Sequence, residues 1–195
     1  MKKNRFTRPV GTRRYKKMFV ISAEGRNTEN QYFRFFCGKN SVVHIRCLSH
    51  GDRSAPEHLL KTIERNLARL DLRAEDEAWC VCDTDKWSEA QLNALLEWSR
   101  RKENYGLAVS NPNFEFWLLL HFEDGSKLKN PADKTRLDRY LPGYAKNISP
   151  AQFPEEKIRE AVARAKKLDN PPCESLPGKR RTTVYRLVEK ILAVA

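Results

Sequence analysis

The sequence predicts an α/β protein in which a parallel sheet of about four strands is flanked by helices. Short apolar segments alternate with amphipathic helical patterns over the first 124 residues, which is typical of consecutive βαβ units. The apolar segments are hydrophobic on both faces, as strands in a covered parallel sheet are. From about residue 125 only helical patterns follow, so we expect a helical extension packed on the same core.

The predicted elements alternate in a regular order along the chain. The strands are expected at 18–21, 42–48, 78–82 and 105–109. Between the second and third strands, Leu59, Ile63 and Leu67 recur at helical spacing. Ser88 and Gln91 form a capping box that predicts the start of the helix after the third strand. The later helices are expected at 131–141, 155–168 and 182–194.

Positive charge is concentrated at the start of the chain. The 195 residues include 37 Lys and Arg against 25 Asp and Glu, a net charge of +12, and residues 1–17 supply +8 of it with no acid. We therefore divide the chain into a flexible basic arm (1–17), an α/β core (18–124) and the extension (125–195). A basic arm is typical of nucleic-acid binding, and a solvated tail is the alternative. The arm residues expected to contact nucleic acid are Arg5, Arg8, Arg13, Arg14, Lys16 and Lys17.

Several classes of protein are excluded by missing patterns. No apolar run approaches the ~18 residues of a membrane span and no secretory signal is present, so we expect a cytoplasmic protein without a membrane partner. The five cysteines contain no Cys-x-x-Cys pair, which favours reduced thiols over a zinc site. The chain has no P-loop, no Gly-x-Gly-x-x-Gly and no Gly-x-Ser-x-Gly motif.

Acidic residues follow three of the predicted strands. Glu24 ends the first strand, Asp83 and Asp85 end the third, and Glu115 lies just after the fourth. Ligands of open parallel sheets bind beyond these carboxyl ends, so neighbouring first and third strands would bring the acids to one crevice. Two carboxylates at ~4 Å repel by about 4 kcal/mol at an effective dielectric near 20. Such a cluster either holds protons or binds a divalent cation, and oxygen ligands suit Mg²⁺.

Each acid also has a structural interpretation. Asp83 and Asp85 are candidates for capping the next helix, although Ser88 already occupies the cap position. Glu29 is interpreted as a first-turn acid favoured by the helix dipole. The aromatic residues from Phe114 to Phe122 are interpreted as core. A phosphatase or glycosyltransferase that uses the same Asp-x-Asp remains an alternative.

Three blocks of the sequence together resemble the RloB family. They are Glu24-Gly25-Arg26-Asn27-Thr28-Glu29-x-x-Tyr32-Phe33, then Asp83-Thr84-Asp85, then Ser110-Asn111-Pro112-x-Phe114-Glu115-x-Trp117 with Leu118 to Phe122. Tyr144-Ala145-Lys146 and the segment from Thr182 to Val188 also fit. The resemblance covers nearly everything after the arm. The block around Glu115 is not shared with topoisomerases and primases, so its role is not carried over from them.

The resemblance implies a Toprim-like, Rossmann-like fold and metal-dependent nuclease chemistry in restriction–modification or anti-phage defence. We expect Glu24, Asp83 and Asp85 to bind Mg²⁺ or Mn²⁺, with Glu24 alternatively acting as the general base. Glu115 is a further candidate ligand, and Lys146 a candidate for stabilising the transition state. The expected substrate is RNA, such as tRNA, or DNA, and a regulatory or sensor protein encoded nearby and an oligomeric state are further expectations. The alternative is a nucleotide- or RNA-binding subunit of a defence complex that cuts nothing unaided.

Overall fold

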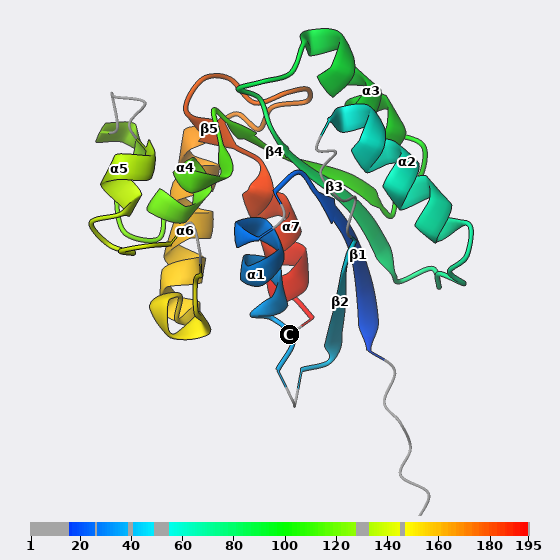
Figure 1. Ribbon diagram of the computed structural model, residues 1–195, viewed down its shortest axis with the longest axis horizontal. Coiled ribbons are helices and arrows are strands. Elements are labelled where there is room, and N and C mark those ends of the chain that lie inside the picture. The colour runs from blue at the N-terminus through cyan, green and yellow to red at the C-terminus, as the bar shows by residue number, and fades with distance from the viewer. Residues whose placement is uncertain are drawn as a thin grey trace, which may run out of the picture.

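A mostly parallel five-stranded sheet forms the centre of the molecule (Figure 1). The computed structural model describes residues 16–25, 27–38, 41–48, 55–127, 133–144 and 147–194. The strand order is β2-β1-β3-β4-β5, in which β5 alone runs antiparallel to its neighbour. The predicted α/β class is confirmed. The strands are β1 (Lys17–Ala23), β2 (Val43–Leu48), β3 (Glu77–Asp83), β4 (Tyr105–Asn111) and β5 (Arg181–Thr182).

Helices cover both faces of this sheet. Helices α2 and α3 lie on one face, and α1, α4 and α7 lie on the other, with α6 and α5 outside α4 (Figure 1). No helix within the described residues is long and apolar enough to cross a membrane. The helices are α1 (Thr28–Arg34), α2 (Pro56–Leu67), α3 (Glu89–Ser99), α4 (Phe114–Leu119), α5 (Asp133–Leu137), α6 (Glu155–Leu168) and α7 (Val184–Leu192), with short 3₁₀ turns at Gly125–Lys127 and Pro150–Gln152.

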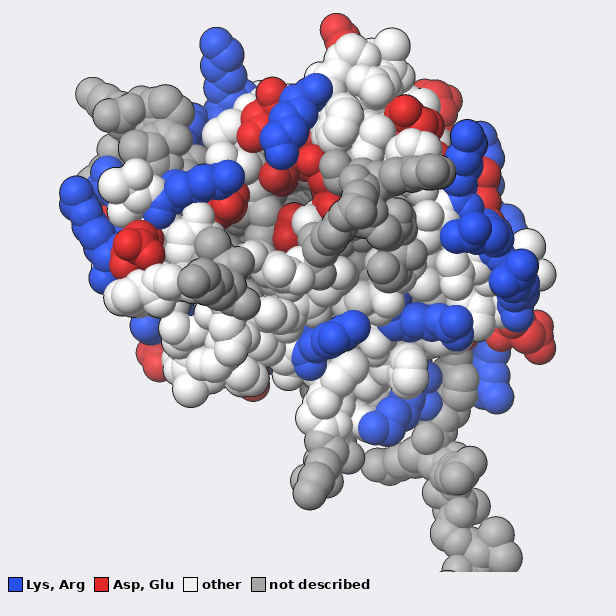
Figure 2. Space-filling view, viewed as in Figure 1, with Lys and Arg blue, Asp and Glu red and all other residues white. Residues whose placement is uncertain are grey.

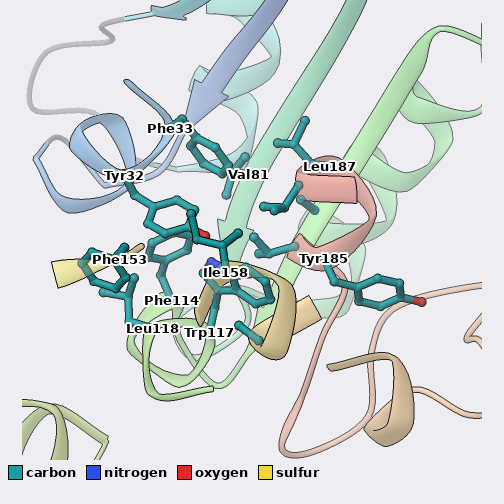
Figure 3. Close-up of a cluster of buried hydrophobic side chains, with 14 of the residues drawn as sticks. Tyr32, Phe33, Val81, Phe114, Trp117, Leu118, Phe153, Ile158, Tyr185 and Leu187 are labelled. Carbon is teal, nitrogen blue, oxygen red and sulfur yellow. The ribbon is translucent and has the colours of Figure 1, made fainter. Parts of the chain in front are cut away.

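The alternation of side chains along each strand divides the core into two layers. In β1, Phe19 and Ile21 join the larger cluster under α1, α4 and α7, whereas Val20 points to the cluster under α2 and α3. Figure 3 shows the larger cluster, in which Tyr32 and Trp117 lie beside residues of α6 and α7. Both layers are strongly apolar, which explains why β1 and β3 in the middle of the sheet lack a polar face, whereas the edge strand β2 alternates buried and exposed residues.

The C-terminal part of the chain, predicted as a helical extension, packs directly on the sheet through α7. The apolar side of α7 carries Leu187, Val188 and Ile191, each fully buried against the sheet. Lys190 of α7 also pairs with Glu77 at the start of β3, with 3.0 Å between Nζ and Oε2. The helix is therefore one of the layers that cover the sheet.

The sequence prediction that strands end near residue 125 is wrong at β5. This two-residue strand pairs Thr182 with Ser110 of β4, and the two hydroxyls lie 3.0 Å apart. Thr183 adds a bond, because its Oγ1 accepts from the Val109 amide at 2.9 Å. Two residues are too few to give a periodic pattern, so no propensity argument detects such a strand.

A buried carboxylate joins the loop after α6 to α7. Asp169 is fully buried and accepts from the Arg186 guanidinium at 2.9 Å, from the Tyr185 hydroxyl at 3.0 Å and from the Cys173 amide at 3.2 Å. All three donors converge on one charged acceptor, so they fix the path of the chain between the two helices.

The arm ends one residue earlier than its predicted boundary. Lys17 is the first residue of β1, and its ammonium lies 2.7 Å from Glu77 Oε1, so it is a paired strand residue instead of a free arm cation. Lys16 is exposed just before the strand. Arg5, Arg8, Arg13 and Arg14 lie outside the described residues.

Candidate functional site

An acidic cleft of about 340 Å³ opens at the carboxyl ends of β1 and β3. Figure 2 shows the carboxylates gathered in this hollow, with lysines at its rim. The strand order makes β1 and β3 neighbours, which is the condition for the acids of both strands to meet. The lining residues are Glu24, Gly25, Asn27, Thr28, Glu29, Asp83, Asp85, Lys86, Asn113, Phe114, Glu115 and Lys134.

Glu24 is held in place by backbone and side-chain donors. Its own amide donates to the Val81 carbonyl at 2.9 Å, which continues the β1–β3 ladder by one residue. Its Oε2 accepts from the Asp83 amide at 3.1 Å and from the Trp87 indole Nε1 at 2.8 Å. Glu24 is 6% exposed, so these two donors replace water around its carboxylate.

The Asp83-Thr84-Asp85 turn is tied to the end of β4. The Thr84 amide donates to the Ser110 carbonyl at 3.0 Å and to the Pro112 carbonyl at 3.2 Å. Ser88 caps α3, with both bonds of the predicted capping box present. Because the cap is occupied, neither aspartate is needed to start the helix, and both line the cleft.

Glu29 is an acid of the first turn of α1, as interpreted from the sequence, and it also belongs to the cleft. It is 8% exposed, and its carboxylate occupies the place where a Cβ on Gly25 would stand. Glycine at 25 is therefore required for this close approach. Burial, with further contributions from Glu115 and Glu24, raises the pKa of Glu29 to about 7.

Glu115 lies on the opposite side of the cleft, in the first turn of α4. Asn113 caps that helix through Oδ1, which accepts from the Phe116 amide at 3.3 Å. The Tyr144 hydroxyl donates to Glu115 Oε1 at 3.3 Å, and Lys134 Nζ lies 3.7 Å from the same oxygen. Glu115 is thus a partly buried carboxylate with a tyrosine and an exposed lysine beside it.

The carboxylates of the cleft interact with one another. Burial raises the pKa of Asp83 well above its usual range, and Glu29, Glu24, Glu115 and Asp85 raise it further. Repulsion of this kind is relieved by a proton or by a cation, and an all-oxygen donor set suits a hard divalent cation. The chemistry of the residues therefore fits Mg²⁺.

The cleft carboxylates are not arranged as a complete set of metal ligands. Among the residues that the structure describes, no three Asp, Glu, His or Cys side chains form a group that could hold a metal ion. Glu24 has one oxygen engaged by two N–H donors, and Asp85 is exposed at the rim. The acids named from the sequence line one cleft, as expected from the strand order, but the sequence did not reveal the hydrogen bonds that engage Glu24.

The predicted site residues therefore divide into two groups. Glu24, Asp83, Asp85 and Glu115 line one cleft. Lys146 lies outside the described residues. The rim cations of the described part are Lys86 and Lys134.

Sequence reasoning missed Glu29 and Trp87 as parts of the site. The signal for Glu29 was its spacing of four residues from Gly25. A glycine at that spacing has no Cβ, so the carboxylate of the acid can lie against the glycine backbone. Trp87 had no comparable signal, because an indole near the end of a strand usually packs in a core. Its role depends on the N–H that reaches Glu24 across 63 residues of sequence.

The aromatic residues of α4 are core residues, as interpreted from the sequence. Phe114, Phe116 and Trp117 are at most 3% exposed, and Figure 3 shows Phe114 and Trp117 beside Tyr32. His121 follows them, and burial lowers its pKa to about 3. Its Nδ1 faces two backbone carbonyls and therefore carries the proton, which leaves Nε2 to accept from the Tyr32 hydroxyl at 3.0 Å.

One family model matches the chain. No curated protein and no solved structure matches it. The model of the RloB-like proteins matches residues 19–191, which include every described residue of the acidic cleft. The match extends from β1 to α7 and so covers the whole sheet with its helices. The chain belongs to the RloB-like protein family.

Proposed function

We propose that this RloB-like protein is a Mg²⁺-dependent nuclease that hydrolyses phosphodiester bonds of RNA, such as tRNA, or of DNA. The observation that carries the proposal is the cleft of five carboxylates contributed by β1, α1, the β3 turn and α4. Mutual repulsion among these acids supports a divalent cation as the resident group. Membership of the RloB-like family supports the rest of the proposal, because the resemblance implies a Toprim-like fold with nuclease chemistry and a setting in anti-phage defence.

Within this proposal, Glu24, Asp83 and Asp85 hold the cation, with Glu115 and Glu29 as neighbouring carboxylates. The bound Mg²⁺ supplies charge stabilisation at the phosphate and lowers the pKa of a bound water. Glu24 has a second role open to it as the base that receives the proton of the attacking water. Lys86 and Lys134 lie at the rim and can contact phosphate oxygens. They could therefore stabilise the transition state, the role expected of Lys146 from the sequence.

A second candidate function is a nucleotide- or RNA-binding subunit that keeps the fold without cutting. The observation that favours it is the pair of N–H donors on Glu24, which satisfies that carboxylate without a metal. In this case the cleft holds protons in place of a cation, and its lysines alone attract phosphate.

One experiment separates the two candidates. The purified full chain is incubated with total RNA and with plasmid DNA, in the presence of Mg²⁺ or of EDTA, and new ends are mapped. The nuclease proposal expects cleavage with Mg²⁺ alone and a rise in Tm of the metal-loaded protein. If neither substrate is cut and Mg²⁺ leaves Tm unchanged, the non-catalytic candidate takes its place.

Trp87→Phe tests whether the indole positions Glu24. The variant keeps an aromatic ring and removes the N–H that donates to Glu24 Oε2, so the carboxylate retains one donor. We expect a fall in kcat of about tenfold with KM little changed, since ~1 Å of misplacement costs up to about 100-fold. Steady-state kinetics on a cleaved oligonucleotide measure the split, and a change in KM alone would contradict a positioning role.

A further inference from the structure

A strip of basic residues that form no ion pair with any described residue leads away from the acidic cleft along α2. We propose that this β2–α2 strip, made of Arg46, Lys61, Arg65 and Arg69, binds the sugar–phosphate backbone of double-stranded nucleic acid. The inference deepens the proposed function and rests on it, because the strip would hold the duplex whose phosphate enters the cleft. Figure 2 shows Lys and Arg side chains over the region where Figure 1 places α2.

The charges of α2 are sorted around its axis. Glu57 and Glu64 face α3, where they contact Gln91 Nε2 at 3.4 Å and Arg101 Nη1 at 2.8 Å. Lys61 and Arg65 are four residues apart, and Arg69 continues the same spacing in the following turn. Successive 100° steps place Arg65 and Arg69 on the side away from α3, toward β2, with Lys61 next to them on the outer surface.

The neighbouring edge of the sheet adds to this positive surface. Strand β2 pairs only with β1 among the described strands, and its exposed residues His44 and Arg46 alternate with buried Val43 and Ile45. Leu48, which shares their face, packs in the core layer under α2. His44 and Arg46 therefore lie on the α2 side of the sheet, beyond the cover of the helix.

The strip cations form no ion pairs within the described part of the chain, although Glu57 and Glu64 lie one helical turn from Lys61. None of the four strip residues forms an ion pair with a described residue. Strand β2 contains no acid, and neither does the side of α2 that carries Arg65. By contrast, Arg101, Arg159 and Arg164 elsewhere on the surface each have a carboxylate within 2.8 Å.

The strip connects the cleft with the start of β1. The first turn of α2 lies at the cleft end, because the Leu59 carbonyl accepts from Ser22 Oγ at 3.2 Å, two residues before Glu24. The helix then runs back along the sheet. At the other end, Asp76 Oδ1 accepts from the Met18 amide at 2.7 Å, so the turn after α2 lies where β1 begins. The basic segment 1–15 is covalently joined to the chain at this same end.

The chemistry of the strip favours a duplex over a single strand. Proteins that bind single strands without sequence preference stack bases on exposed aromatic rings. The strip has none, and the one large exposed hydrophobic among the described residues is Tyr140, just after α5. Lys61 to Arg69 spans about 12 Å at 1.5 Å per residue, enough for two or three phosphates along one strand. Recognition of backbone without bases is the chemistry of sequence-independent duplex binding.

The test measures binding of the full chain to a fluorescent duplex of about 24 base pairs, roughly two helical turns. Fluorescence anisotropy gives the affinity at a series of KCl concentrations, with EDTA present. Duplex RNA, duplex DNA and a single strand of the same length are compared. The strip variant is Arg46→Gln/Lys61→Gln/Arg65→Gln. Its control is Arg139→Gln/Lys167→Gln/Lys179→Gln, which removes the same charge from exposed positions after α5, on α6 and before β5.

We expect the strip variant to lose on the order of 100-fold in duplex affinity at about 0.1 M salt, with a slope of log K against log salt less negative by about 2 to 3. The control variant is expected to bind like the parent, and either duplex binds more tightly than the single strand. Equal losses in both variants, tighter binding to the single strand, or no duplex binding by the parent would each overturn the proposal.

The assay is independent of cleavage. EDTA removes the cation, and a gel confirms that the duplex stays intact. A parent that binds duplex through the strip but cuts nothing in Mg²⁺ therefore supports this surface while contradicting the nuclease proposal. If the parent cuts nucleic acid while the strip variant binds duplex as tightly as the parent, the nuclease proposal is supported and the strip proposal is contradicted.

Discussion

Asp83→Asn is expected to lose Mg²⁺-dependent cleavage by about 100-fold or more while the metal-free protein stays at least as stable as the parent. The substitution keeps the shape of the side chain and removes a charge from a cleft that holds four other carboxylates. Cleavage falls because an amide is a poor ligand for the cation and water and phosphate are no longer aligned. Stability does not fall, because burial and the acidic neighbours disfavour the charged form of the carboxyl group that is removed.

The pH dependence of this variant has a definite sign. The pKa of Asp83 is raised in the folded protein by burial and by its acidic neighbours, so ionisation above its unfolded pKa destabilises the parent relative to its unfolded chain. The amide of the variant has no such proton to lose. The advantage of the variant in free energy of unfolding is therefore expected to grow as the pH rises above the unfolded pKa, which is near 4. Urea denaturation in EDTA at a series of pH values measures it.

Ser88→Ala is the matched control for the helix-cap interpretation. It removes the residue that caps α3 and is expected to cost about 1 kcal/mol of stability with cleavage retained. If Asp83→Asn behaves in this way and keeps its activity, then Asp83 is a structural residue and the assignment of the site is wrong.

The largest loss of stability is expected from Asp169→Ala, at about 3 kcal/mol. The substitution leaves the Arg186 guanidinium, the Tyr185 hydroxyl and the Cys173 amide without their shared buried acceptor at the end of α6. The Arg186 side chain is 33% exposed, so water recovers part of its interaction and the loss stays at the lower end for buried pairs.

Glu155→Ala provides the comparison with a surface pair. Glu155 and Arg159 lie one turn apart on α6, and both are more than half exposed, so we expect a change within about 0.5 kcal/mol. Urea unfolding of both variants at neutral pH gives the two values. Equal losses would mean that Asp169 acts as an ordinary surface acid.

The sheet could be predicted because its strands are short apolar segments separated by helical patterns. The positions of the acids could also be predicted, because the residues that follow neighbouring parallel strands meet at the same edge of the sheet. Glu24, Asp83 and Asp85 follow from that rule alone. Glu115 reaches the cleft only because the end of β4 lies beside the end of β3. The hydrogen bonds from the Thr84 amide to the Ser110 and Pro112 carbonyls hold the two strand ends together.

Other features depend on contacts that local sequence does not encode. From the sequence, Glu29 is interpreted only as a first-turn acid, because the helix-dipole argument takes no account of the missing Cβ of Gly25 that lets its carboxylate enter the cleft. Lys17 looked like part of the arm because its partner Glu77 is 60 residues away. The two residues of β5 have no pattern, and their pairing with β4 depends on hydroxyl contacts between Ser110 and Thr182.

The position of α7 in the sequence separates the synthesis of the cleft acids from the completion of the cover over the sheet. A polypeptide that has reached α4 already contains Glu24, Asp83 and Glu115, but not the helix that covers Ile21 and Val81. During synthesis the acidic residues therefore exist well before the sheet can bury that face. The helix that packs on this face of the sheet is therefore made after every described carboxylate of the cleft, so the cleft acids are complete before the sheet has its full cover.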